Sequence, residues 1–178
     1  MRRGRSVDAY VFVKNADLAT VEQLQRLVAV EGTGVRAVEP LTGPADAFVA
    51  VEAPDVRGVR RIVQGTLRDA GARDTDVALG IYPAQRIVRR WLQTPEYTAY
   101  ARIRVHPGTA KDVVAAVEQM EGHLGSAAVT GTYDVLAAFG AQDFDTLTDV
   151  LLGQLHSLDA IAWTVTAIAQ AEGPGEAS

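Results

Sequence analysis

The chain has 178 residues, of which 48% are apolar and 22% charged, a composition typical of globular proteins rather than of fibrous or disordered ones. It contains no cysteine, which excludes disulfides, thiolate metal sites and cysteine nucleophiles and is compatible with a reducing cytosol. The net charge of −5 is uneven, because residues 1–97 carry 14 basic and 12 acidic side chains whereas residues 98–178 carry 3 and 10. This acidic balance argues against an autonomous nucleic-acid binder, and no apolar run approaches the ~18 residues of a membrane span.

The first half of the chain reads as a βαββαβ unit over residues 8–82. Asp17 is well placed to cap its first helix, and Pro40, which lacks a backbone donor, belongs at a sheet edge or a bulge. The apolar stripe of the first helix consists of Leu18, Val21, Leu24, Leu27 and Val28. In chain order we predict a strand over 8–14, a helix from 17, strands over 35–41 and 47–52, a helix from 54 to about 70, and a strand over 75–82.

The second half repeats this order over residues 98–170. Thr109 starts a capping-box-like sequence before its first helix, and Asp143 is the expected cap of the second. In chain order we predict a strand over 100–105, a helix from 109 to the glycine at 122, strands near 126–129 and 135–139, a helix from 143, and a strand over 161–169. An amphipathic helical linker is expected over residues 83–97 and a disordered tail over 171–178.

One short motif occurs in both units. Thr42 to Asp46 and Thr130 to Asp134 both read T-G-x-x-D between two apolar runs, which is turn chemistry because glycine supplies a positive φ and aspartate can bond to backbone donors. The spacing between the two motifs is 134 − 46 = 88 residues, and five apolar positions of the second helices match on the same offset. We interpret the chain as a tandem duplication.

The fold class that follows is α+β, with two tandem ferredoxin-like βαββαβ units. In such a unit both helices cover one face of a four-stranded antiparallel sheet. Tyr10, Phe12 and Tyr100 lie on the opposite face, so we expect the two sheets to pack face to face as an intrachain pseudo-dimer of the dimeric α+β barrel type. Arg102 and Arg104 share that face and require ion partners or water there.

Four segments of the second unit form a recognisable pattern: Tyr100 to Val105, Pro107-Gly108, Val129 to Asp134 and Leu155 to Leu158. In these segments the unit resembles the ligand-binding (RAM) domain of the Lrp/AsnC transcription regulators. The first unit resembles it more faintly, because it keeps Gly43 and Asp46 but has Ala45 where the family has an aromatic residue. Since the first strand begins near Asp8, we expect a stand-alone tandem RAM protein without the helix-turn-helix DNA-binding domain of the family.

The resemblance implies a cytoplasmic homo-oligomer that senses a small-molecule effector such as an amino acid, without contacting nucleic acid or membrane, and that modulates a full-length Lrp/AsnC-type regulator. The implied ligand-binding residues are Thr130, Gly131, Tyr133 and Asp134, with Gly43 and Asp46 as a weaker equivalent. Glycine admits a ligand carboxylate to the backbone and an acid can bind an ammonium group. The alternative is that T-G-x-x-D is only a strand-connecting turn whose aspartate satisfies backbone donors.

Catalytic, metal and cofactor signatures are lacking in the sequence. His106, His123 and His156 form no metal-binding pair, and neither a phosphate loop nor a nucleophile motif occurs. We therefore expect no cofactor, no metal and no enzymatic activity. Two alternatives remain open: a cofactor-poor monooxygenase of the dimeric α+β barrel type, for which Trp163, Tyr82 and His106 could line a pocket, and a purely structural oligomerisation protein.

A basic helix face is expected in the first unit. Its members are Arg57, Arg60, Arg61 and Arg68. Because the chain as a whole is acidic, we interpret this face as solvated or in contact with an acidic neighbour rather than as a phosphate-binding surface.

Overall fold

The computed structural model describes residues 6–85 and 95–171. The described residues divide into two compact units, one formed by those up to 82 together with 129–132 and the other by the rest. Residues 129–132 end the strand His123–Thr130 and begin the turn after it, and they are named below with the second unit, to which the rest of that strand belongs. The first unit contains β1 (Val7–Lys14), α1 (Leu18–Leu27), β2 (Val35–Pro40), β3 (Ala47–Ala53), α2 (Val56–Arg61), which continues as the π-helix η1 (Ile62–Leu67), and β4 (Asp74–Gln85).

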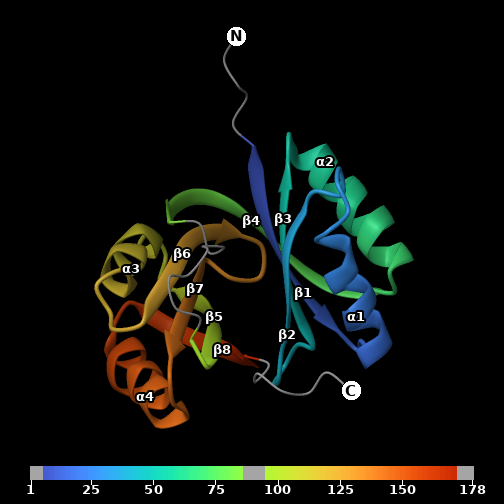
Figure 1. The fold of residues 1–178 in the computed structure, drawn as a ribbon. Helices are drawn as coiled ribbons and strands as arrows, with labels where there is room; N and C mark the ends of the chain where they lie inside the picture. Colours follow the sequence, from blue (N-terminus) through green and yellow to red (C-terminus); the bar gives the residue numbers. More distant parts are fainter. Residues whose placement is uncertain (1–5, 86–94, 172–178) are drawn as a thin grey trace. The chain divides into compact units, whose positions relative to one another are not determined.

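The strands of the first unit form an antiparallel sheet in the order β2-β3-β1-β4, and α1 and α2 lie on one face of it (Figure 1). β2 is the outer strand next to β3, and its pairing shifts between Val35 and Ala37. Pro40 ends this strand, so the prediction that it belongs at a sheet edge is confirmed.

The second unit has the same order of elements. It contains β5 (Tyr97–Val105), α3 (Ala110–Val117), β6 (His123–Thr130), β7 (Val135–Ala141), α4 (Phe144–Asp149), the π-helix η2 (Val150–Gln154), the 3-10 helix η3 (Leu155–Ser157) and β8 (Ile161–Gln170). Its strands follow the order β6-β7-β5-β8, with α3 and α4 on one face (Figure 1). The predicted α+β class with ferredoxin-like units is therefore confirmed.

Each unit has its own apolar core between helices and sheet. In the first unit Val11, Val49, Leu24 and Leu67 belong to this core, while the rings of Phe12 and Phe48 pack at 5.5 Å outside the core cluster. The predicted helical stripe is correct only in part, because Val21 and Leu24 are buried but Leu18 is 73% and Val28 43% exposed. Leu18 is the first helical residue and Val28 is the C-cap. Both therefore lie at the ends of the helix, beyond the part of its face that packs on the sheet.

Aspartate side chains cap three of the helices, among them the two caps that the sequence predicted at Asp17 and Asp143. The carboxylates of Asp17, Asp55 and Asp143 accept hydrogen bonds from backbone N–H groups three residues later, at 2.7 to 2.8 Å. Hydrogen bonds from the side chain and then the backbone of Thr20 lower the pKa of Asp17. Thr109 is the N-cap residue of α3 as expected, but its side chain accepts no capping hydrogen bond, and its hydroxyl donates to the carbonyl of His106 at 2.8 Å.

The second helix of each unit differs from the sequence expectation. Both helices change from α to π geometry after six residues, a wider winding that apolar spacing does not encode. β4 extends through Gln85, so residues 83–85 are strand rather than the start of the expected linker helix. The rest of that linker up to residue 94 and the expected tail from residue 172 lie outside the described residues. Within the described ranges no helix combines the length and the apolarity needed to cross a membrane.

Candidate functional site

The turn Thr130–Asp134 is held to the end of β5 by its aspartate. The Asp134 carboxylate accepts a hydrogen bond from the backbone N–H of Val105 at 3.0 Å, and its own N–H donates to the carbonyl of Ile103 at 3.0 Å. The Nε of Arg104 lies 3.6 Å from the same carboxylate. Asp134 therefore joins the turn before β7 to the neighbouring strand.

The corresponding turn of the first unit is built in the same way. The Asp46 carboxylate accepts from the backbone N–H of Ala16 at 3.1 Å, and its N–H donates to the carbonyl of Val13 at 2.8 Å. Gly43 has a φ of +128°, and Gly131 has a φ of +125° in the second turn. In both turns the aspartate carboxylate therefore accepts a hydrogen bond from a backbone N–H. This is the structural role that the sequence left open as the alternative to ligand binding.

Tyr133 is the aromatic member of the second turn, and it packs within its own unit. Only 8% of its surface is exposed, its ring meets that of Trp163 edge-on at 5.6 Å, and the guanidinium carbon of Arg102 lies 5.0 Å from the ring centre. Arg102 is a buried charge, 2% exposed, on β5. Ala45, which is 2% exposed, stands at the corresponding place in the first unit, so that turn has no such aromatic cluster.

The four sequence-predicted site residues therefore fall into two pairs. Thr130 and Gly131 are exposed at the end of β6, whereas Tyr133 is buried and Asp134 half-buried. Sequence reasoning missed Trp163 and Arg102 as neighbours of Tyr133. The alternation of β5 did place Arg102 on the face away from the helices, but only the fold brings it against a ring 31 positions later.

Histidines do not build a metal centre in the part of the chain that the structure describes. Nε2 of His123 lies 3.0 Å from the hydroxyl of Ser126, and Nε2 of His156 lies 3.1 Å from that of Thr164. No group of three or more His, Cys, Asp or Glu side chains in the described ranges is arranged to hold a metal ion.

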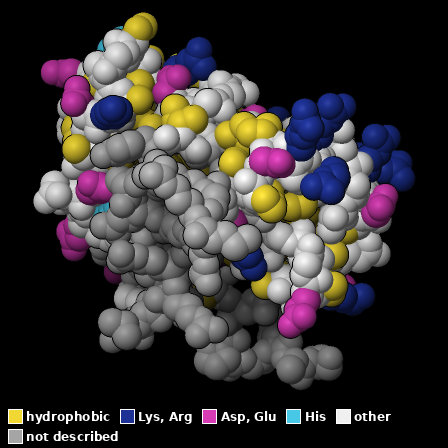
Figure 2. Space-filling view, turned by 90° about the horizontal axis from the view of Figure 1, so that it is seen from above, with side chains coloured by type: hydrophobic (Ala, Val, Ile, Leu, Met, Phe, Trp, Pro, Cys, Tyr) yellow, Lys and Arg dark blue, Asp and Glu magenta, His cyan; other side chains and the backbone are white. Residues whose placement is uncertain are grey.

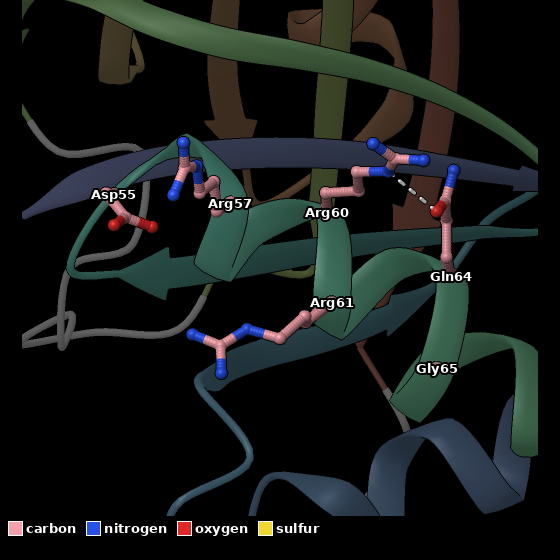
Figure 3. A pocket seen from close by; sticks show the side chains of 6 residues that line it. All are labelled: Asp55, Arg57, Arg60, Arg61, Gln64 and Gly65. Carbon is pink, nitrogen blue, oxygen red and sulfur yellow. Dashed lines mark hydrogen bonds between the residues drawn. The ribbon is translucent and has the colours of Figure 1, made fainter.

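A hollow of about 800 Å³ lies on the first unit, along α2. It is lined by Asp55, Arg57, Arg60, Arg61, Gln64 and Gly65 (Figure 3). The Nε of Arg60 donates to the amide oxygen of Gln64 at 2.9 Å, and Arg61 leaves the helix in another direction. Three guanidinium groups around one open hollow make it attractive to carboxylates or phosphates.

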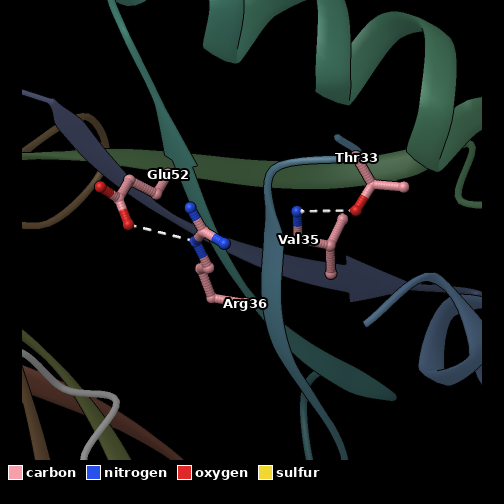
Figure 4. A network of polar contacts seen from close by, with 4 residues as sticks. All are labelled: Thr33, Val35, Arg36 and Glu52. Carbon is pink, nitrogen blue, oxygen red and sulfur yellow. Dashed lines mark hydrogen bonds and ion pairs between the residues drawn. The ribbon is translucent and has the colours of Figure 1, made fainter. Parts of the chain in front are cut away.

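A smaller hollow of about 290 Å³ adjoins it and shares Arg61. Its rim includes Thr33, whose hydroxyl donates to the carbonyl of Val30 at 3.0 Å and accepts from the N–H of Val35 at 3.3 Å. Glu52, also on the rim, pairs with Arg36 through an Nε–Oε2 distance of 3.1 Å (Figure 4). Thr33 and Glu52 on this rim therefore each have a hydrogen-bond or ion partner within the first unit.

Solved structures similar to this chain are found over most of its length. The siroheme decarboxylase NirDL covers 96% of this chain with 73% of its own, at 10% identity and a TM-score of 0.67. An anthrone oxidase-like protein covers 95% with 92% of its own, at 10% identity and a TM-score of 0.58. The protein TTHA0845 from Thermus thermophilus matches 44% of this chain over 99% of its own length, at 26% identity and a TM-score of 0.41. No curated protein matches the sequence.

The expectation that the protein lacks enzymatic activity is corrected by these matches. Two structures that resemble nearly the whole chain are described as a decarboxylase and as an oxidase-like protein. At 10% identity this likeness concerns the fold alone. Because the same fold occurs in enzymes, the missing sequence motifs are no argument against catalysis.

The family comparison concerns the second unit. Residues 98–172 match the family described as the Lrp/AsnC ligand binding domain, and the match includes the turn Thr130–Asp134 and the cluster of Arg102, Tyr133 and Trp163. The resemblance stated from the sequence is thereby confirmed. The match to the Lrp/AsnC ligand binding domain thus covers residues 98–172, which is less than half of the 178-residue chain.

Proposed function

We propose that the protein is a small-molecule-binding and oligomerisation module of the Lrp/AsnC type, with an amino acid or a related metabolite as effector. The observation that carries the proposal is the match of residues 98–172 to the ligand-binding domain of that family. Residues 8–82 would be a degenerate copy from a tandem duplication, a view supported by the equivalent bonds of Asp46 and Asp134.

The effector site of this proposal is the turn of the second unit. Thr130 and Gly131 supply an exposed backbone with a positive φ at the glycine, and Tyr133 supplies an aromatic wall against Trp163. A ligand carboxylate can approach such a backbone closely, because glycine has no side chain in the way. Asp134 holds the turn in place and is half-buried beside it.

The partner of this module would be a full-length regulator of the same family or further copies of the chain, in the cytoplasm. The chain's acidic net charge of −5 supports a role without direct DNA contact. Effector binding would then act on transcription through mixed assembly. Co-purification of the protein with a tagged regulator, with and without effector, tests that step.

Thermal-shift screening against amino acids and common metabolites tests the site. A ligand at a hundredfold excess over its Kd stabilises the folded state by roughly 2.7 kcal/mol, which corresponds to a shift of several degrees. Tyr133→Phe keeps the ring contacts and removes the hydroxyl, and Thr130→Ala changes an exposed side chain. Both variants should reduce the ligand-induced shift, while the matched Thr42→Ala in the first turn should not. Equal shifts in all three proteins would remove the turn from the site.

A second candidate function is an enzyme of the same α+β architecture. It is favoured by two solved structures that cover 95–96% of the chain and are described as a siroheme decarboxylase and an anthrone oxidase-like protein. A chromophore that co-purifies with the protein, or oxygen consumption that depends on an added anthrone or similar aromatic substrate, would favour this candidate. Amino-acid binding without either result would favour the sensor.

A further inference from the structure

The second helices of the two units carry opposite charges at corresponding positions. α2 and α4 each follow the third strand of their unit and have the same length, and their bounds differ by a constant offset (144 − 56 = 88 and 149 − 61 = 88). On this offset Arg57 corresponds to Asp145 and Arg61 to Asp149. All four side chains are exposed.

The two charge pairs have the same spacing. Arg57 and Arg61 are four residues apart, as are Asp145 and Asp149, so each pair occupies successive turns of one helix, roughly 6 Å apart. None of these four residues takes part in an ion pair within the described ranges. Dark blue Lys and Arg side chains gather at one side of the face seen in Figure 2. The charges of both helices are thus available to an external partner.

We propose that the basic face of α2 in one copy of the chain docks on the acidic face of α4 in a second copy. If the two helices pack antiparallel, Arg57 lies against Asp149 and Arg61 against Asp145. The two helix dipoles then point in opposite directions, which is their attractive arrangement. Guanidinium and carboxylate groups match in shape, because both can form two parallel hydrogen bonds. This proposal rests on the proposed oligomerisation, and it specifies the two helix surfaces that would mediate it.

Exposed apolar side chains favour a second copy over a small anion as the occupant of the hollow along α2. Val56 of α2 is 55% exposed, Phe144 of α4 51%, and Leu152, one turn beyond Asp149, 61%. A small anion would leave all three in water, whereas helix-on-helix docking covers them. Exposed ion pairs contribute little to the free energy of association, so the apolar contacts are needed to stabilise the complex. The ion pairs select the register in which the two helices pack.

The contact is heterologous, because the surface used on one copy differs from the surface used on the next. Each chain then has one basic and one acidic docking face, and successive copies assemble head to tail into a ring or an open chain. The assembly should weaken with salt, because exposed charges are screened over about 10 Å at 0.1 M ionic strength.

Charge reversal in the full chain tests the contact. We expect Arg57→Glu/Arg61→Glu and, separately, Asp145→Arg/Asp149→Arg to raise the dissociation constant of assembly at least about tenfold, measured by sedimentation velocity. Mixing the two variants in equal amounts should restore assembly, since each then offers the charge that the other lacks. Arg26→Glu on α1 is the matched control for a surface charge reversal, and circular dichroism verifies that all variants are folded.

Each outcome decides the proposal. Assembly of the wild-type protein that persists in both variants would overturn this contact and leave the proposed oligomerisation standing. A wild-type protein that stays monomeric at low salt would overturn both. If inorganic phosphate stabilises that monomer and the stabilisation is lost in Arg57→Glu/Arg61→Glu, the hollow is a small-anion site and the docking proposal is wrong.

Discussion

The carboxylate of Asp134 accepts a hydrogen bond from the backbone N–H of Val105 at 3.0 Å, across 29 positions of sequence. The bond ties the turn before β7 to the end of β5, where the N–H of Val105 would otherwise need another acceptor. Asp46 makes the equivalent bond to Ala16 in the first unit. Both aspartates therefore contribute to stability independently of any ligand.

Replacement of Asp134 by alanine should lower the free energy of unfolding by about 1–3 kcal/mol, because a half-buried backbone donor loses its acceptor. Asp134→Asn keeps an acceptor and should cost less. Urea unfolding at neutral pH measures both. Asp159→Ala, at an exposed position, is the control, and a loss in Asp134→Ala no greater than in this control would contradict the assigned role.

The N-cap of α4 should make stability depend on pH. Hydrogen bonds from the backbone N–H and then the hydroxyl of Thr146 hold the pKa of Asp143 below its usual value of 3.8. Because the folded pKa is the lower one, this stabilisation is present above the unfolded pKa and is lost as the pH falls through the folded pKa. Asp143→Asn keeps a capping oxygen but cannot titrate.

We expect Asp143→Asn to be less stable than the wild-type protein at about pH 6 and to approach it as the pH falls below 3.8 and through the lowered pKa of the folded state. Chemical unfolding at a series of pH values measures the difference between the two proteins. Asp145→Asn removes an exposed acid of the same helix that is not a cap and serves as the control. A difference between wild-type and Asp143→Asn proteins that stays constant with pH would contradict the titration of this cap.

Gly34 should tolerate no side chain. Its φ is +75°, and a Cβ there would lie 2.5 Å from Cδ1 of Ile62 and 2.7 Å from the carbonyl oxygen of Glu52. Gly32 has a similar φ of +81° but no atom within 4 Å of a Cβ. Gly32→Ala should therefore cost roughly 1–2 kcal/mol for backbone strain alone, and Gly34→Ala about 1–3 kcal/mol more.

Thermal unfolding of both glycine variants, with chemical unfolding where the transition is reversible, checks this difference. The pair separates the cost of a positive φ from the cost of a clash, because only the second differs between the two sites. Equal losses of stability in the two variants would show that the loop adjusts around Ile62 and that the close approach is not required.

The burial pattern of α1 predicts very different costs for two leucines. Leu24 is fully buried in the core of the first unit, and Leu18 at the start of the same helix is 73% exposed. Leu24→Ala should lower the free energy of unfolding by about 2–5 kcal/mol through lost burial and a cavity, whereas Leu18→Ala should change it by less than about 0.5 kcal/mol. Denaturant unfolding of the two variants side by side makes the comparison, and similar losses would contradict the assigned face.

Much of the fold follows from local patterns. Alternating apolar residues predicted the strands, and the aspartates at 17 and 143 predicted helix starts, because both signals depend on neighbours within one element. Thr109 also marked a helix start correctly, but its side chain makes no capping bond and its hydroxyl donates to the carbonyl of His106, a contact that the motif does not reveal. The π-helical segments were not predicted either, because their apolar residues keep the spacing of an ordinary helix.

The sequence by itself determined the order of elements, the two turns with their glycines and aspartates, and the resemblance of residues 98–170 to the Lrp/AsnC domain. Only the tertiary structure decided that Asp134 bonds to Val105 and that Tyr133 packs against Arg102 and Trp163. The physical reason is distance along the chain. Turn and strand preferences are properties of adjacent residues, whereas these contacts join side chains that come together only when the sheet and its helices have formed.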